Sequence, residues 1–237
     1  MLILAHRGSH SRTQTENTIE AFQDAVAEGA DGVELDLRVA RDEEIVIVHD
    51  DNLHRVAGDA HAIKELTSDE LSKIPLRNGG VIPTLNEVTA AIHAPTVLDL
   101  EVKDEDVARL LITKLKTSAA LRGRTIVSSY HAGVLQDVKR ECPDVRTLFL
   151  VARWPLPLQK KDLWKRFREL EPWGVAFPLV FMNARRVRYL RTLNVRAGAW
   201  DWHDRATRRE AKKAVRLGLD FAILKHVAAA KILPITE

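Results

Sequence analysis

The residues in this sequence that are best suited to chemistry include two acids on one short segment. Glu34 and Asp36 alternate with the aliphatic residues of Gly32–Leu37. Successive side chains of a β-strand point to opposite faces, so the two carboxylates would share one face and the aliphatic side chains the other. Neighbouring carboxylates raise each other's pKa unless a positive group lies between them, and Mg²⁺ or Ca²⁺, which prefer oxygen ligands, would meet this need. The segment therefore predicts a site for a divalent cation.

A second segment repeats this alternation. Asp99, Glu101 and Lys103 occupy every other position, with aliphatic residues between them. Either segment alone is also typical of an amphipathic strand at the surface. Two such segments in a chain whose pattern, described below, predicts a barrel favour a shared polar site. Polar residues at the carboxyl ends of barrel strands are typical of catalysis.

Two histidines complete the set of candidate residues. His6 and His49 each follow a short apolar run. Imidazole titrates near neutral pH and is the most frequent general acid or base in enzymes. A single histidine at a strand end more often makes a structural hydrogen bond, but two that converge on the same carboxylates favour catalysis. Arg7 and Lys103 add positive charge for a phosphate, and a guanidinium matches phosphate oxygens with two parallel hydrogen bonds.

The elements that must position these residues follow from a second pattern. Short apolar runs alternate with helical segments along the whole chain, which predicts βα units and a parallel sheet. The chain has 237 residues, and a (β/α)₈ barrel typically has roughly 250. We therefore predict an α/β protein with a (β/α)₈ TIM barrel, as a single domain over residues 1–237. The expected strands are Leu2–Ala5, Gly32–Leu37, Thr96–Val102, Thr125–Ser129, Arg146–Val151, Gly174–Phe177, Val195–Trp200 and Phe221–Leu224. The expected helices are Glu16–Glu28, Leu85–His93, Glu105–Ala119, Ala132–Glu141, Leu158–Glu169, Asn183–Leu193, Arg205–Leu217 and a short one from about Val227.

One segment interrupts the alternation. Ile45–Val48 follows the second strand after only the short stretch Ala40–Glu44. Parallel neighbours need a crossover of about a dozen residues or more, so this pair is predicted to be an antiparallel hairpin that returns His49 to the barrel mouth. The stretch from Asp50 to Pro83 is expected to be polar and irregular, with one short helix at Ser68–Lys73. We predict a small insertion, at about residues 40–83, over the mouth of the barrel.

The chain resembles the glycerophosphodiester phosphodiesterase family in an ordered series of short motifs. The motifs are His6-Arg7-Gly8, Glu16-Asn17-Thr18, Glu34-x-Asp36, His49-Asp50, Pro83-Thr84-Leu85 and Glu101-x-Lys103. Each motif is weak alone, but six in order are highly specific, and the resemblance extends from residue 3 to about residue 225. It implies a TIM barrel of the PLC-like phosphodiesterase type.

The resemblance also implies an activity and a role for each matched residue. The implied roles are Glu34, Asp36 and Glu101 as ligands of one divalent cation, Mg²⁺ or Ca²⁺, His6 and His49 as the general acid/base pair, and Arg7, Lys103 and Trp200 as substrate contacts. The family hydrolyses glycerophosphodiesters to glycerol 3-phosphate and an alcohol, and the glycerol hydroxyl can attack first to give a cyclic phosphate. The implied partner is therefore a small-molecule glycerophosphodiester.

Several positions depart from the family pattern. The turn Ala40-Arg41-Asp42-Glu43 lacks the family's glycine, and Thr15 stands where the family usually has proline. The family's Trp-Thr-x-Asn segment reads Trp200-Asp201-Trp202-His203, and its closing Thr-Asp reads Leu224-Lys225. The two late changes fall where the pocket for the alcohol is expected. That pocket and the level of activity are therefore where this chain would differ from the family.

Composition limits the other functions that the chain could have. The net charge is only +3, and the basic runs Arg185–Arg188 and Arg205–Lys213 are interpreted as solvated helix faces rather than a nucleic-acid surface. No apolar run approaches the ~20 residues of a membrane span. The apolar start of the chain is too short for a secretory signal, and the single Cys142 fits a reducing compartment. We expect a cytoplasmic location and no stable membrane insertion, and the oligomeric state is undetermined.

Two alternatives remain open at this point. One is a related phospholipase D-like enzyme that acts on lysophospholipids, which would expose apolar side chains at the barrel mouth. The other is a weakly active barrel that binds phosphodiesters or polyanions, which the basic helix faces and the altered Leu224-Lys225 end would favour.

Overall fold

The strands of this computed structural model close into a barrel. The structure describes residues 1–11, 13–155, 160–201 and 208–231. The strands are β1 (Leu2–His6), β2 (Gly32–Val39), β3 (Ile45–Ile47), β4 (Val97–Val102), β5 (Thr125–Ser129), β6 (Arg146–Leu150), β7 (Gly174–Pro178), β8 (Arg196–Trp200) and β9 (Phe221–Leu224). All except β3 pair in parallel, in the order β1-β9-β8-β7-β6-β5-β4-β2, and β1 pairs with β2 to complete the ring. This is the predicted (β/α)₈ barrel, with β3 added antiparallel to β2.

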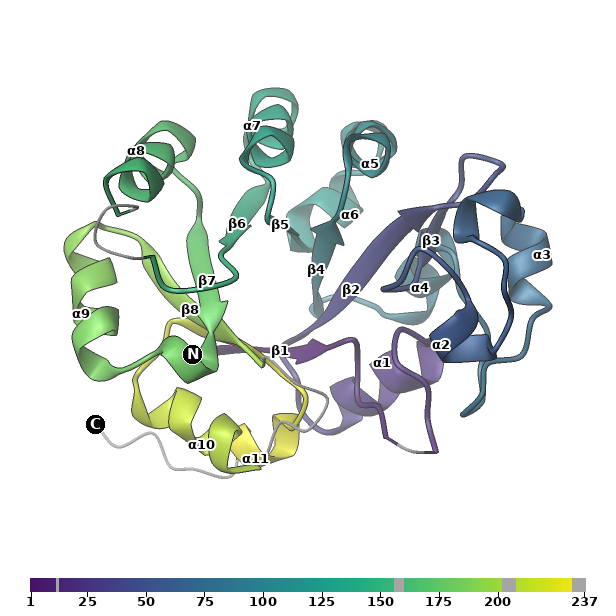
Figure 1. Ribbon diagram of the computed structural model, residues 1–237, viewed down its shortest axis with the longest axis horizontal. Helices are drawn as coiled ribbons and strands as arrows, with labels where there is room; N and C mark the ends of the chain where they lie inside the picture. The colour runs from purple at the N-terminus through teal and green to yellow at the C-terminus, as the bar shows by residue number, and fades with distance from the viewer. Residues whose placement is uncertain (12, 156–159, 202–207, 232–237) are drawn as a thin grey trace.

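Helices surround the barrel on its outside (Figure 1). They are α1 (Ile19–Ala27), α2 (His54–Ala57), η1 (Ile63–Glu65), α3 (Ser68–Ser72), α4 (Leu85–Ala91), α5 (Glu105–Thr117), α6 (Ala119–Arg124), α7 (Ala132–Glu141), α8 (Lys160–Leu170), η3 (Leu179–Phe181), α9 (Ala184–Thr192), α10 (Arg208–Arg216) and α11 (Val227–Lys231). None of the helices in the described part of the chain combines the length and the apolar composition that a membrane span requires.

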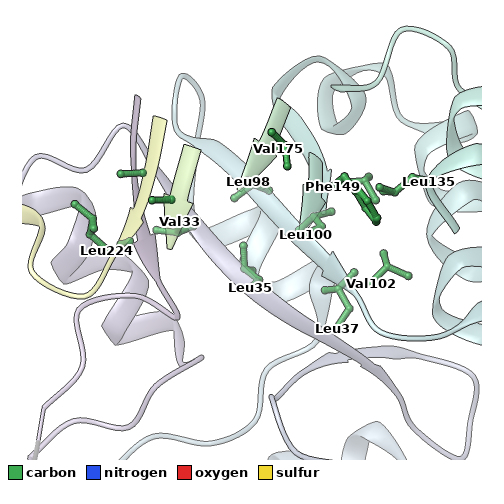
Figure 2. Packing of buried hydrophobic residues seen from close by; sticks show 14 of the residues in the cluster. Val33, Leu35, Leu37, Leu98, Leu100, Val102, Leu135, Phe149, Val175 and Leu224 are labelled. Carbon is green, nitrogen blue, oxygen red and sulfur yellow. The ribbon is translucent and has the colours of Figure 1, made fainter. Parts of the chain in front are cut away.

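The alternation of residues along β2 and β4 sorts their side chains between two environments. Val33, Leu35 and Leu37 of β2 are fully buried in the main hydrophobic core. Figure 2 shows them in the same cluster as Leu98 and Leu100 of β4. The residues between them are acidic and point to the opposite face, into the barrel. The two-residue period of the sequence thus forces these acids into the interior, because the outer face is already occupied by aliphatic side chains.

The lower part of the barrel interior is apolar. Side chains from β1, β5, β6, β7 and β9 form one buried cluster there, and Phe221 is its largest member. Phe221 fits because β7 and β8 carry glycines opposite it: a Cβ built on Gly198 would lie 2.1 Å from the Phe221 ring, and one on Gly174 would lie 2.8 Å from it. The interior therefore has a dry floor, above which the polar residues lie.

The insertion is better ordered than the sequence suggests. Residues 50–83, predicted to be irregular, contain α2, η1 and α3, and only α3 was expected. With Ala40, Val46 and Val48 of the hairpin they form a separate hydrophobic cluster, in which Leu53, Ile63 and Leu71 are almost completely buried. The apolar residues of this stretch are spaced too irregularly to show a helical or strand period, so the prediction was wrong. The cluster fixes the insertion beside β2 and β3 (Figure 1).

Other differences from the prediction have local causes. The first helix begins at Ile19 rather than Glu16, because Asn17 adopts a positive φ of 60° and the Thr18 side chain accepts a hydrogen bond from the Ala21 nitrogen as its N-cap. The helix α6, which directly follows α5, was not predicted. In the turn that lacks the family's glycine, Glu43 itself takes the left-handed conformation, with φ 58°.

The packing of the barrel floor gives a first prediction. We expect Gly198→Ala to lower the free energy of unfolding by about 1–3 kcal/mol, the usual cost of overpacking a core, because the added methyl group would clash with Phe221. The control is Gly133→Ala on α7, where a Cβ would meet nothing within 4 Å. That change should raise the free energy of unfolding by about 0.5 kcal/mol, since alanine favours a helix over glycine. Urea denaturation measures both, and equal stabilities for the two variants would contradict this account of the floor.

Candidate active site

Three carboxylates meet at the carboxyl ends of two adjacent barrel strands. Glu34 and Asp36 lie on β2, and Glu101 lies on β4 directly beside Asp36 in the parallel register. One oxygen from each of the three lies within 4.8 Å of the others. The Glu34 and Asp36 side chains are 2% and 0% exposed. Buried like charges at this separation require positive or hydrogen-bonding partners.

Asp36 has such partners on every side. Lys103 Nζ lies 2.7 Å from its Oδ1 and Arg7 Nε lies 3.1 Å from its Oδ2. The side-chain nitrogen of Asn17 donates a hydrogen bond to Oδ2 at 2.8 Å. Burial alone would raise the pKa of Asp36, but the charges of Lys103 and Arg7 outweigh it and hold that pKa well below its usual range. Asp36 is therefore ionised at neutral pH.

Glu34 lacks equivalent compensation. Burial, and then the charges of Asp36 and Glu101, raise the pKa of Glu34 well above its ordinary value. The Arg7 main-chain nitrogen donates a hydrogen bond to Oε2 at 3.0 Å. The other oxygen, Oε1, is buried and has no hydrogen-bond partner among the described residues. A divalent cation would satisfy Oε1 and reduce the repulsion among the three acids, and a donor set made only of oxygens suits Mg²⁺ or Ca²⁺. The acids named from the sequence therefore fit a metal site.

The two cations predicted to contact a phosphate lie among the acids. Lys103 Nζ lies 2.6 Å from Glu101 Oε1 and so bridges Glu101 and Asp36. Arg7 extends in the other direction, where its Nη1 lies 3.0 Å from Glu16 Oε1. Arg7 has a φ of 56°, a strained conformation of the kind that is frequent in active sites. Of the two cations, Arg7 lines the central cavity. Contact with a phosphate stays a prediction for both.

His6 lies at the end of β1 and lines the same cavity. Its Nε2 is 4.0 Å from Glu34 Oε2, because β1 pairs with β2 so that His6 is opposite Glu34. Burial, together with the nearby charge of Arg7, lowers the pKa of His6 to about 3. In the metal-free protein at neutral pH, His6 is therefore a neutral imidazole that can accept a proton.

His49 reaches the cavity from the hairpin, as the sequence predicted. Its main-chain oxygen accepts a hydrogen bond from Arg38 Nη2 at 2.9 Å, which anchors the chain where it leaves β3. Its Nδ1 lies 2.7 Å from Asp50 Oδ1. Asp50 in turn lies 2.6 Å from Arg55 Nε. This carboxylate fixes the Nδ1 nitrogen as a proton donor and leaves Nε2 available for a substrate.

Sequence reasoning assigned no role to Glu16, Asp50 or Arg55, which all belong to this network. Arg55 also contacts Glu16, with Nη2 2.7 Å from Oε1, so Glu16 joins Arg55 to Arg7. Glu16 is 8% exposed, and its contact with Arg55 spans 39 residues of sequence. Glu16 and Asp50 belong to motifs quoted for the family, so the sequence marked both residues as important but did not indicate what either does. Nothing in the sequence indicated Arg55.

The central cavity has a volume of about 460 Å³ and two unlike sides. The side formed by β1, β2, β4 and the insertion carries the acids, histidines and arginines described above. The opposite side is formed by the ends of β5, β6, β8 and β9, and its residues are Ser128, Tyr130, Leu150, Trp200, Asp201 and Ile223. Trp200 thus lines the cavity as predicted, and its ring is edge-on to that of Tyr130, with centroids 6.2 Å apart.

The acidic residue that shares a face with Glu101 has a different place. Asp99 is fully buried, precedes Glu101 by two residues on β4 and lies beside Glu34 in the parallel register, but it is not among the residues that line the cavity. Burial raises the pKa of Asp99 to about 7. Of the late departures from the family pattern, Asp201 lines the cavity, and Lys225 follows β9. Trp202 and His203 lie outside the described residues.

Comparison with known proteins extends over nearly the whole chain. The model of the glycerophosphoryl diester phosphodiesterase family matches residues 6–228. The glycerophosphodiester phosphodiesterase of Caldanaerobacter subterraneus subsp. tengcongensis is 33% identical over 158 residues, which are 61% of this chain and 64% of that relative. The glycerophosphodiester phosphodiesterase of Thermotoga maritima has a similar structure, with a TM-score of 0.79 and 25% identity over 99% of this chain and 98% of the other.

A phosphodiesterase from Oleispira antarctica, solved with its product sn-glycerol-3-phosphate, aligns with a TM-score of 0.81 and 24% identity over 98% of this chain and 95% of its own. At that identity the likeness concerns the fold. The family model, in contrast, covers His6, His49, the three clustered acids and the two cations Arg7 and Lys103. The chain belongs to the glycerophosphoryl diester phosphodiesterase family.

Proposed function

We propose that this protein is a metal-dependent glycerophosphodiester phosphodiesterase, which hydrolyses a glycerophosphodiester to glycerol 3-phosphate and an alcohol. The observation that carries the proposal is a cluster of three acids from distant parts of the sequence, two of which, Glu34 and Glu101, line one cavity together with both histidines. The names of similar proteins support it, as does the glycerol 3-phosphate bound by the Oleispira enzyme. A cytoplasmic location belongs to the same proposal and rests on composition alone.

The chain's own groups have distinct tasks in the proposed reaction. Neutral His6 accepts the proton of the attacking hydroxyl, and His49, held through Nδ1 by Asp50, donates a proton from Nε2 to the leaving alcohol. Arg7 pairs with Asp36 and lines the cavity, where its guanidinium stabilises negative charge on the phosphoryl oxygens. A divalent cation held by Glu34, Asp36 and Glu101 would supply further stabilisation of that charge.

The insertion has a part in this proposal. Asp50 and Arg55 both lie in residues 40–83 and both line the cavity. We infer that the insertion forms one side of the barrel mouth and holds His49 in position, while the barrel strands hold the acids. The whole chain then works as one domain.

The metal requirement is testable with a chelator. Turnover of glycerophosphocholine should be lost in EDTA and restored by Mg²⁺ or Ca²⁺, because the repelling acids would then regain their counter-charge. Unchanged turnover in the chelator would refute the metal assignment. A lysophospholipid in the same assay tests the lipid-directed alternative. Binding of a polyanion without turnover of any diester would support the weakly active barrel instead.

His49 offers a test of the acid/base assignment. His49→Ala should lower kcat for glycerophosphocholine by at least about a hundredfold, since a positioned acid or base contributes about 10²–10⁴-fold. The matched control is His54→Ala, which removes an exposed histidine of the same insertion. Steady-state kinetics and circular dichroism give rate and fold together. A near-normal rate for His49→Ala would remove His49 from the mechanism.

Glu34 allows the metal site to be examined without an activity measurement. The pKa of Glu34 in the folded state lies above that of the unfolded chain, so its ionisation destabilises the metal-free fold as the pH rises to neutrality. Glu34→Gln should therefore raise the melting temperature of the metal-free protein at pH 7. It should also abolish the stabilisation that Mg²⁺ or Ca²⁺ gives the native protein, which adds about 2.7 kcal/mol to the free energy of unfolding at a hundred times the Kd and is seen as a rise in melting temperature. A variant that responds to the ion like the native protein would exclude Glu34 as a ligand.

A further inference from the structure

Asp201 is a buried acid in the cavity wall that the proposed reaction does not use. It directly follows β8, lines the central cavity and is 3% exposed. One carboxylate oxygen, Oδ2, accepts a hydrogen bond from the main-chain nitrogen of Lys225 at 2.7 Å. The other, Oδ1, is buried and accepts no hydrogen bond from any described residue. A buried carboxylate oxygen without a partner is costly, and it is an available acceptor for a ligand.

Two aromatic rings lie on the same side of the cavity as Asp201. Trp200 precedes it at the end of β8, and Tyr130 follows β5. The two rings are nearly perpendicular, with an interplanar angle of 87°. The face of an aromatic ring attracts a cation, and both rings line the cavity, where either can offer a face to an ammonium group. Together with a carboxylate, they form the chemical surroundings that an alkylammonium group prefers.

The charged groups near Asp201 are compatible with a bound cation. Burial raises the pKa of Asp201 to about 7, the charge of Glu210 acts in the same direction, and Lys225 acts against them. The positive groups that surround the acids, Arg7 and Lys103, are engaged with Asp36 and do not appear among the causes of this shift. A bound cation would favour the charged form of Asp201 and would give its Oδ1 oxygen a partner.

We propose that Asp201, Trp200 and Tyr130 form a subsite for a positively charged alcohol, so that the enzyme prefers glycerophosphodiesters whose alcohol carries an ammonium group. This inference rests on the proposed function, because it assigns the phosphate to the side of the cavity with the acids and the alcohol to the side with the aromatic rings. Asp201 stands where the family pattern has threonine. The subsite is therefore a property of this chain rather than of its shared catalytic groups.

A structural role for Asp201 has to be separated from this one. Its main-chain nitrogen donates to the Ile223 oxygen, and its Oδ2 accepts from Lys225, so the residue also joins the ends of β8 and β9. Asparagine at this position keeps an oxygen for the Lys225 nitrogen, removes the negative charge and puts an NH2 group in place of the second oxygen. Asp201→Asn therefore isolates the proposed interaction, and thermal unfolding of the variant checks that the joint between the strands is kept.

The test compares two substrates that differ only in charge. Glycerophosphocholine is compared with its carbon isostere, the glycerophosphodiester of 3,3-dimethylbutanol, in which a carbon replaces the quaternary nitrogen. We expect the native enzyme to prefer the choline diester at least about tenfold in kcat/KM, mainly through KM, and Asp201→Asn to bring that ratio close to one. Asp201→Glu, which keeps the charge, should retain part of the preference. The same ratio in the native enzyme and in Asp201→Asn, or no preference in the native enzyme, would overturn the subsite.

A binding measurement distinguishes failure of this inference from failure of the proposed function. Calorimetry compares the binding affinity of phosphocholine with that of 3,3-dimethylbutyl phosphate, and this measurement does not require turnover. If no glycerophosphodiester is hydrolysed, the proposed function fails, yet tighter binding of phosphocholine by the native protein than by Asp201→Asn would still support the subsite. Equal binding of the two phosphates by the native protein would refute it.

Discussion

The repulsion among three carboxylates held within 4.8 Å is the interaction on which the rest of this structure depends. A flexible site would relax by separating them. Here Glu34 and Asp36 are two residues apart on one strand, and Glu101 is beside Asp36 on the next, so the backbone hydrogen bonds of the barrel hold them together. The outer faces of both strands are packed into the main core, so the strands cannot rotate to move the acids apart. The fold thus maintains an arrangement that is unfavourable without a cation.

The partial compensation that the protein does provide extends outward as a chain of ion pairs. It leads from Asp36 through Arg7 to Glu16, then through Arg55 to Asp50, which holds His49. Asp36, Glu16 and Asp50, the three acids in this series of ion pairs, each contact at least two hydrogen-bond donors. Each of these three charges therefore has a partner. The chain connects the strand acids to the insertion, and the insertion is stiff enough to take part because it has a hydrophobic cluster of its own. The position of His49 therefore depends on the barrel and on the insertion together.

The sequence predicted the barrel and the site well where the pattern is local. All eight barrel strands lie within one or two residues of their expected ranges, because the buried strands are short apolar runs bounded by polar turns. The two-residue period predicted that Glu34, Asp36 and Glu101 face inward, and it predicted the same for Asp99; the resemblance to the family singled out Glu101. The insertion did not follow, since its core forms between residues with no regular spacing. The link between Glu16 and Arg55 is a contact over 39 residues, and no local pattern carries information about such a pair.

The cavity divides the tasks of the site between two groups of strands. The strands that carry the acids and the first histidine, β1, β2 and β4, keep every residue that the family motifs name. Thr15 and the turn Ala40–Glu43 also depart from the family but do not line the cavity, whereas Asp201 and Lys225 lie after β8 and β9, on the side with Trp200. A change on that side cannot disturb the compensated charge of Asp36, because its partners Lys103, Arg7 and Asn17 all come from the other half of the barrel. Separation of this kind allows the recognition of one part of a substrate to vary while the chemistry at the phosphate stays the same. It follows that Asp201, although it departs from the family pattern, is compatible with a fully assembled set of acids and histidines.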